Sequence, residues 1–191
     1  MITFKAQYID STNIIKIADN KNKNAHKVSF IELDAKDPSD LNAIRKVASS
    51  WDKYSYASDI YNHALSAHLW NEDTGQAFFA LTEQRNNFEK ANPFDILGIC
   101  EIRKRFGTNY YLNYIQTDPE FMFEPLRFGE ATYKNIGKAL IKKVLDYFPK
   151  KNLVLHATSS SIDFYKKIGG IVINPDSKYI LLKNGLLNKI V

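Results

Sequence analysis

The chain has 191 residues, of which 45% are hydrophobic and 13% aromatic, so it contains enough apolar side chains for a single packed domain over 1–191 and is too apolar for a disordered chain. Its net charge of +5 permits an anionic ligand or a nucleic acid and selects neither. A single cysteine excludes an intrachain disulfide, and no apolar run reaches the roughly 20 residues of a membrane span, so we expect a cytoplasmic protein without a membrane partner.

The first half of the chain predicts strands that flank two helices. Residues 1–26 form a strand and loop extension, with a strand at 2–8 indicated by alternating apolar side chains and a turn at 19–24 indicated by an Asn- and Lys-rich stretch. Asp37 followed by Pro38 is typical of a helix start, and the apolar residues after it recur at helical spacing. We therefore expect strands at 27–34 and 75–84 and helices at 38–51 and 55–70.

The second half predicts a hairpin followed by alternating helices and strands. The connection between its strands at 109–117 and 153–157 passes through a helix, so these two strands should be parallel. Hairpin connections should make the earlier strands antiparallel, which predicts an α/β (α+β) fold with a mixed, mostly antiparallel sheet flanked by helices. The expected elements are strands at 96–104, 109–117 and 153–157, a long loop at 118–131, a helix at 137–148, a short helix that ends at Gly169 and Gly170, and two strands around a turn at 174–177.

Residues 132–138, TYKNIGK, lie between the long loop and a helix start. The first amides of a helix have no partner within it and carry the positive end of its dipole, so a helix start readily binds phosphate. Gly137 lets a ligand approach the backbone, and Asn135 tolerates the left-handed conformation. Lys134 and Lys138 add positive charge. The alternative is that Asn135 only caps the helix and that the lysines are solvated.

Two segments together resemble the GCN5-related N-acetyltransferase (GNAT) family. The stretch TYKNIG at 132–137 falls on the family's Gln/Arg-x-x-Gly-x-Gly/Ala loop, and SIDFYKKIGG at 161–170 falls on its A-x-x-F-Y-x-x-x-G-F motif. The resemblance covers residues 96–173. The departures from the usual pattern are Thr132 in place of Gln or Arg, Asn135 in place of the first Gly, and Gly170 in place of Phe.

The resemblance implies a GNAT-like sheet whose parallel strands 109–117 and 153–157 splay apart near Gln116 and bind acetyl-CoA, the cosubstrate. A main-chain amide would hold the thioester carbonyl, and the Tyr165 phenol would protonate the departing thiolate. The alternative for Tyr165 is a core aromatic beside Phe164. The residues that the resemblance places at the cofactor are Ile115, Gln116, Thr117, Thr132, Tyr133, Lys134, Asn135, Ile136, Gly137, Lys138, Ala139, Ser160 and Tyr165.

An acceptor amine arrives protonated and must lose a proton before it attacks, and our candidate for the catalytic base is Glu101, inside a predicted strand. His156, Glu124 and Glu130 are further candidates, and each of the four has the alternative of being an ordinary polar residue. No metal is expected, because the sequence lacks an HExxH motif and its one cysteine, Cys100, sits in an apolar run as a small buried hydrophobe.

These inferences predict an N-acetyltransferase that transfers the acetyl group of acetyl-CoA to the primary amine of a small molecule or of a lysine-like side chain. The alternatives are an inactive acyl-CoA-binding module and a protein directed at RNA, although scattered rather than clustered lysines argue against a nucleic acid partner. Helix 55–70 and loop 118–131 should form the acceptor site, where Glu124 and Glu130 would attract the amine. The phenylalanines of this loop would hold an apolar stem, or else cover the core or join a homodimer.

Overall fold

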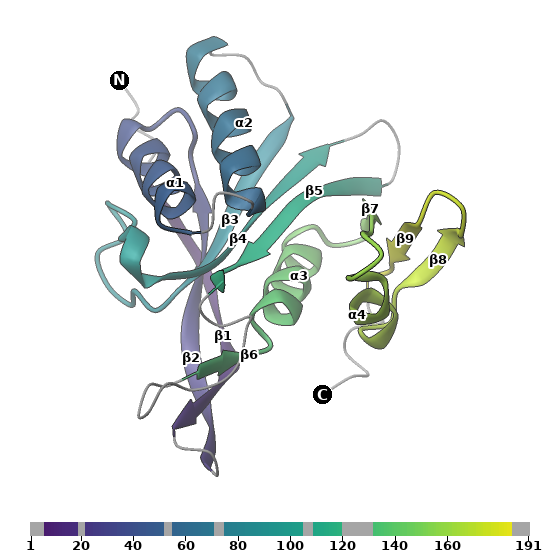
Figure 1. The fold of residues 1–191 in the computed structure, drawn as a ribbon. Helices are drawn as coiled ribbons and strands as arrows, with labels where there is room; N and C mark the ends of the chain where they lie inside the picture. Colours follow the sequence, from purple (N-terminus) through teal and green to yellow (C-terminus); the bar gives the residue numbers. More distant parts are fainter. Residues whose placement is uncertain are drawn as a thin grey trace.

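The computed structural model describes residues 6–18, 22–51, 55–70, 75–104, 109–119 and 132–184. Within these ranges, nine strands form one sheet in the order β6-β1-β2-β3-β4-β5-β7-β9-β8 (Figure 1). The strands are β1 (Gln7–Ala18), β2 (Asn22–Leu33), β3 (Gln76–Thr82), β4 (Ile96–Lys104), β5 (Asn109–Thr117), β6 (Thr132–Lys134), β7 (Asn152–His156), β8 (Ile171–Asn174) and β9 (Tyr179–Leu182). The helices are α1 (Pro38–Ser50), α2 (Tyr56–Trp70), α3 (Ile136–Tyr147) and α4 (Ile162–Lys167), with a 3-10 turn η1 at Pro93–Asp95.

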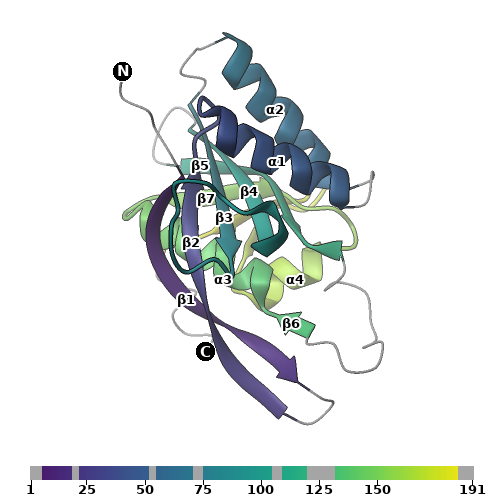
Figure 2. The same cartoon turned by 90° about the vertical axis from the view of Figure 1, so that its left-hand side faces the viewer.

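Helices cover both faces of the sheet. α1 and α2 lie on one face and α3 lies on the other (Figures 1 and 2). The central strands β3 and β4 are therefore buried on both faces, which explains why their sequences are continuous apolar runs rather than alternating ones. Asp37 caps α1 as predicted, because its carboxylate accepts hydrogen bonds from the amides of Ser39 and Asp40.

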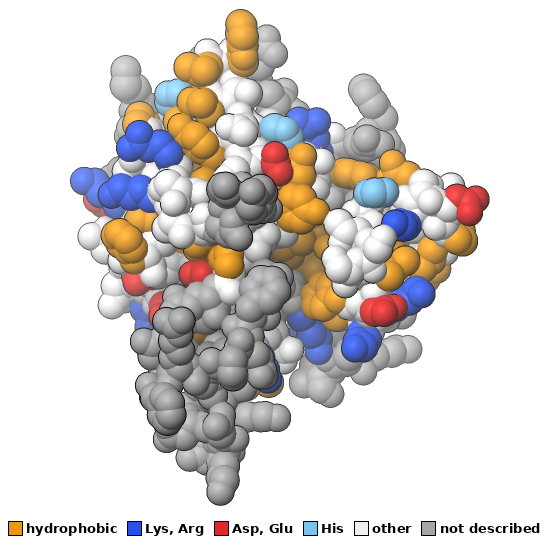
Figure 3. Space-filling model, viewed as in Figure 1, with side chains coloured by type: hydrophobic (Ala, Val, Ile, Leu, Met, Phe, Trp, Pro, Cys, Tyr) orange, Lys and Arg blue, Asp and Glu red, His pale blue; other side chains and the backbone are white. Residues whose placement is uncertain are grey.

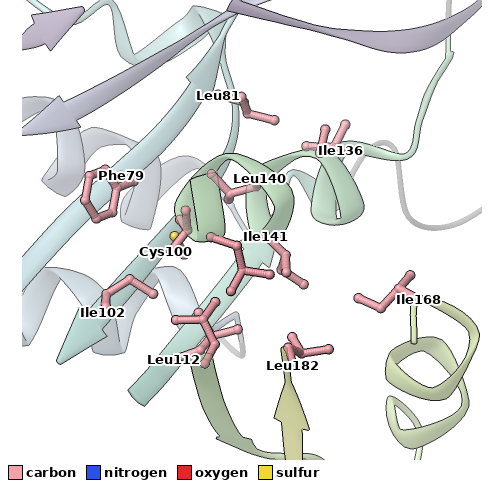
Figure 4. Packing of buried hydrophobic residues seen from close by; sticks show 14 of the residues in the cluster. Phe79, Leu81, Cys100, Ile102, Leu112, Ile136, Leu140, Ile141, Ile168 and Leu182 are labelled. Atoms are coloured by element: carbon pink, nitrogen blue, oxygen red, sulfur yellow. The ribbon is translucent and has the colours of Figure 1, made fainter. Parts of the chain in front are cut away.

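The core between α3 and the sheet supports the segments that carry the candidate site. Leu140 and Ile141 of α3 point toward Cys100, Ile102 and other apolar side chains of the central strands (Figure 4). Cys100 is fully buried in this cluster, so the prediction of a small buried hydrophobe is confirmed. Gly98 of β4 is needed for this packing, because a Cβ there would lie 2.9 Å from Cγ2 of Ile136.

β5 and β7 form the parallel pair, and the other neighbouring strands are antiparallel. β5 and β7 pair at only three positions, Asn109 with Asn152, Tyr110 with Leu153 and Tyr111 with Val154. A bulge between β4 and β5 places Asn113 as an extra residue opposite Glu101 and Ile102. The predicted mixed, mostly antiparallel sheet with a parallel pair is confirmed, and the two strands diverge beyond Tyr111.

The N-terminal hairpin differs from the prediction. β1 runs over 7–18 instead of 2–8, and β2 begins at 22 inside the stretch that was expected to be a turn. Residues 1–5 lie outside the described ranges. β6, which was expected to be loop, pairs with β1 from Ile15 opposite Lys134 to Ile17 opposite Thr132. The start of β2, NKN at 22–24, has weak intrinsic strand preference, and β6 has only three residues, so their pairing with β1, which local patterns do not reveal, decides their conformation.

Candidate active site

A cleft of about 1210 Å³ opens where β5 and β7 diverge. β5 forms one wall, the end of β7 and the start of α4 form the other, and the start of α3 closes one side. In the space-filling view, hydrophobic side chains surround the hollow at the centre of this face (Figure 3). The cleft therefore lies at the point where two parallel strands cease to pair and a helix begins.

Most of the predicted cofactor residues line this cleft. Two are exceptions, since Ala139 packs into the core under α3 and Thr132 begins β6 with a side chain that the structure does not describe. The structure brings the following predicted residues to the cleft: Ile115, Gln116, Thr117, Tyr133, Lys134, Asn135, Ile136, Gly137, Lys138, Ser160 and Tyr165.

The start of α3 is shaped by Asn135. This residue adopts the left-handed conformation, with φ 68° and ψ 16°, and its side chain makes no capping hydrogen bond. Its carbonyl accepts the first helical hydrogen bond, from the amide of Ala139 at 2.9 Å. The alternative that Asn135 serves as a side-chain cap is therefore wrong, and Asn135 instead turns the backbone so that the helix starts at the cleft.

Gly137 leaves open space at the start of α3 and is not required for close packing. A Cβ at this position would lie 3.7 Å from Cζ of Phe164 and 3.7 Å from Cγ2 of Thr117, which are ordinary contacts. The fold itself would accept an alanine here. A glycine at the second residue of α3 thus leaves the helix start accessible from the cleft, where a larger side chain would project.

Tyr165 lies in α4 and is 6% exposed, with its remaining accessible surface in the cleft. Burial raises the pKa of its phenol to about 12, and the neighbouring Tyr56 contributes in the same direction. The phenol is therefore protonated at neutral pH and able to donate a proton. The backbone at Gly170 packs against the end of α4, where its amide donates a hydrogen bond to the Tyr165 carbonyl at 2.8 Å. A Cβ at this position would lie only 2.7 Å from that oxygen. This contact explains the glycine in place of the phenylalanine of the motif.

The predicted base, Glu101, is fully buried on the α2 face of β4. Its Oε2 lies 2.7 Å from Nδ1 of His63, and its Oε1 accepts from Nε2 of Gln76 at 2.8 Å and from Nδ2 of Asn113 at 3.1 Å. Nε of Arg103 lies 3.5 Å from the same Oε1. The carboxylate is thus held by side chains from α2, β3, β4 and β5 and is not itself on the cleft surface.

The other predicted acceptor-side residues are only partly described. His156 ends β7 and lines the cleft, with its ring centroid 5.6 Å from that of Tyr179. The start of α2 reaches the cleft through Tyr56, and the expected place of helix 55–70 in the acceptor site stays a prediction. Glu124, Glu130 and most of the loop 118–131, including its phenylalanines, lie outside the described residues.

Four tyrosines on the wall of the cleft were not anticipated. Tyr56 and Tyr114 contact each other with ring centroids 5.5 Å apart, and Tyr111 and Tyr179 approach each other to 6.4 Å. All four line the cleft. Strict alternation along β5 would place Tyr111 and Tyr114, three residues apart, on opposite faces. The bulge at Asn113 changes this alternation, and no local pattern predicts either the bulge or the place of Tyr56 beside them.

Two further findings concern metal sites and membrane spans in the described part of the chain. It contains no group of three or more His, Cys, Asp or Glu side chains arranged for a metal ion. No helix within it is long and apolar enough to cross a membrane.

Comparisons with known proteins agree at the level of the fold. No family model matches the sequence, and no curated protein matches it. Among solved structures, an acetyltransferase of the GNAT family from Desulfovibrio desulfuricans aligns over 81% of this chain and 95% of its own, with a TM-score of 0.54 and 16% identity. AtaT, in a complex with acetyl-methionyl-tRNAfMet, aligns over 85% of this chain and 98% of its own, with a TM-score of 0.55 and 12% identity. The chain therefore has the fold of the GCN5-related N-acetyltransferases.

Proposed function

We propose that this chain is an acetyl-CoA-dependent N-acetyltransferase that acts on the primary amine of a small molecule or of a lysine-like side chain. The observation that carries the proposal is the cleft between β5 and β7, because it ends at an open helix start and also contains a buried, protonated phenol. Each of these features suits a different part of acetyl-CoA.

The phosphates of the cosubstrate suit the start of α3. The amides before Ala139 lie at the positive end of the helix dipole, Gly137 leaves them accessible, and Lys134 and Lys138 line the cleft beside them. The pyrophosphate would bind here through main-chain donors.

The pantetheine and thioester end suits the edge of β5, which runs away from the helix start at Thr117. The edge of β5 at Ile115, Gln116 and Thr117 faces the opening left by β7, so the pantetheine chain would lie along it. Tyr165 lines the same cleft and would then donate a proton to the thiolate of CoA as the carbon–sulfur bond breaks.

Charge on the acceptor side suits a cationic amine. Burial raises the pKa of the Tyr114 phenol, and the charges of Asp59 and Glu101 raise it further, whereas the charge of Arg103 lowers it, so two carboxylates and one guanidinium act on this residue of the cleft wall. A protonated amine entering from this side would be attracted by the two carboxylates, which outnumber the guanidinium. This arrangement supports an amine acceptor over an anionic one.

A second candidate acceptor is the amino group of an aminoacyl-tRNA. AtaT, which shares the fold, was solved with acetyl-methionyl-tRNAfMet. The tyrosines of the cleft, Tyr56, Tyr111, Tyr114 and Tyr179, offer ring faces on which a terminal base would stack. Acetylation of charged tRNA in preference to small amines would select this candidate.

The test is steady-state release of CoA from acetyl-CoA with a panel of small amines, lysine peptides and aminoacyl-tRNA. Acetyl transfer to any of these amines establishes the reaction, and the preferred acceptor identifies the class. Binding of acetyl-CoA by calorimetry without transfer to any member of the panel would contradict the proposal and favour an inactive acyl-CoA-binding module.

A further inference from the structure

A buried carboxylate and a partly exposed imidazole form a pair beside the cleft. The side chain of Glu101 is completely buried, whereas that of His63, on α2, is 31% exposed. Their Oε2 and Nδ1 atoms are 2.7 Å apart. A fully buried group cannot contact an acceptor directly, so His63 is the member of the pair that is open to its surroundings.

The network around Glu101 fixes which nitrogen of His63 carries the proton. A carboxylate accepts hydrogen bonds, so Nδ1 of His63 donates to it and the lone pair lies on Nε2. Gln76 and Asn113 donate to the other carboxylate oxygen and prevent the carboxylate from turning away. This arrangement holds the imidazole with a basic nitrogen directed away from the buried partner.

His63 is adjacent to the acceptor side of the cleft. Its ring centroid is 5.4 Å from that of Tyr114, and its Nδ1 is 3.4 Å from Nδ2 of Asn113. Tyr114 and Asn113 both line the cleft. The imidazole of His63 therefore brings the middle of α2 into contact with the bulge of β5.

We propose, on the basis of the acetyltransferase function proposed above, that His63 is the catalytic base and that Glu101 is its positioning residue. Nε2 of His63 takes one proton from the ammonium group of the acceptor and becomes an imidazolium. The freed nitrogen lone pair forms the C–N bond to the acetyl carbonyl carbon. The C–S bond breaks, its electron pair leaves with the sulfur, and Tyr165 protonates that sulfur. The second amine proton returns to Tyr165 through solvent, and His63 releases its proton to solvent.

Charged and titratable groups on each packed element lie around the imidazole. Glu101 contacts it from β4, where Arg103 in turn lies against the carboxylate, Tyr114 packs beside it from β5, and Asp59 lies one turn earlier on α2. Glu101 stabilises the imidazolium that forms on proton transfer. The predicted role of Glu101 is thereby changed from direct base to partner of the base.

The test compares His63→Ala, Glu101→Gln and a control, His68→Ala, in steady-state acetyl transfer. His68 lies on the same helix but its Nδ1 is 3.0 Å from the carbonyl of Ala35, outside the network. His63→Ala should lower kcat/KM for the amine by roughly 10²- to 10⁴-fold, the usual contribution of a positioned base. Its Kd for acetyl-CoA, measured by calorimetry, should be unchanged, which also shows that the variant is folded.

Two readouts separate a base from a merely structural histidine. Imidazole added to His63→Ala should restore part of the rate, and the acid limb of the kcat/KM profile should disappear. Glu101→Gln keeps the side-chain shape, so it should fold, lower kcat/KM and move the acid limb to lower pH because the imidazolium loses its carboxylate. His68→Ala should match the wild type in rate and profile.

Failure of this inference and failure of the proposed function would give different results. If the wild type transfers acetyl groups and His63→Ala retains its rate within about threefold without responding to imidazole, this inference is wrong and the proposed function stands. If the wild type binds acetyl-CoA but acetylates no amine in the panel, the proposed function is wrong and this inference fails with it.

Discussion

The two sides of the cleft are built in different ways. On the α3 side, the start of one helix and one short segment of β5 form the wall, and the main chain supplies most of the chemistry. On the α2 side, the polar network around Glu101 joins side chains from four elements. The first side is suited to a ligand of constant structure, and the second to a ligand that differs between proteins of the same fold.

Charge follows the same division. Lys134 and Lys138 lie on the α3 side, while Asp59 and the buried Glu101 lie on the α2 side. An anionic cosubstrate and a cationic acceptor would each meet the opposite charge, and each would be repelled from the wrong half of the cleft. In the proposed assignment, the half of the cleft that would bind the cosubstrate depends on backbone conformation, whereas the half that would bind the acceptor depends on particular side chains.

The largest expected effect is a loss of rate on removing the Tyr165 hydroxyl, which lies between the two halves of the cleft. Tyr165→Phe should lower kcat by roughly 10²- to 10⁴-fold, the usual contribution of a general acid, because the phenol is needed when the thiolate leaves. Its Kd for acetyl-CoA should remain close to that of the wild type. Tyr147→Phe is the matched control, because that phenol, on α3, donates to Glu32 outside the cleft. A full rate in Tyr165→Phe across the pH range would make Tyr165 a packing residue.

A smaller effect is expected from closing the helix start. Gly137→Trp would remove main-chain contacts to the pyrophosphate, and the loss of one hydrogen bond to a charged group, about 1.5–3 kcal/mol, corresponds to roughly tenfold to 100-fold weaker binding. Gly137→Ala should weaken binding less, since the fold accepts a Cβ there. Ser49→Trp, on the exposed surface of α1, controls for the added indole. Equal acetyl-CoA affinity in Gly137→Trp and Ser49→Trp, measured by calorimetry, would remove the cofactor from this end of α3.

The smallest effect on the cleft is expected from a change beside α1, which should alter the stability of the fold and leave acetyl-CoA binding unchanged. Asp40 is buried, its Oδ1 has no hydrogen-bond partner, and burial raises the pKa of its carboxyl to about 7. The folded protein therefore holds a proton that the unfolded chain releases above about pH 4, so this carboxyl destabilises the fold increasingly as the pH rises from about 4 to 7. Asp40→Asn should gain stability relative to the wild type over that interval.

Urea unfolding of Asp40→Asn and the wild type at pH 5 and pH 8 measures this difference. The acetyl-CoA affinity of both proteins at pH 8 provides the comparison between the two sides and should be the same. A stability difference that is independent of pH would show that Asp40 is ionised in the folded protein at both pH values.

The same division explains what the sequence revealed. The left-handed Asn135 and the open Gly137 follow from local patterns, because they are near neighbours in one segment, whereas the cleft position of Tyr165 was expected only from the resemblance of residues 161–170 to the family motif. The pairing of His63 with Glu101 joins residues 38 positions apart, and neither residue has a local signal for the other. β6 was likewise missed, because its three residues become a strand only through pairing with β1.

The most direct measurement of the central claim is hydrogen–deuterium exchange with and without acetyl-CoA. The account predicts slower exchange at 113–117 of β5 and at 136–138 of α3, where the pantetheine and the pyrophosphate would bind, and no change in α1 or β2. Acetyl-CoA that binds, as shown by calorimetry on the same sample, without slowing exchange in either segment would place the cosubstrate elsewhere and contradict the account.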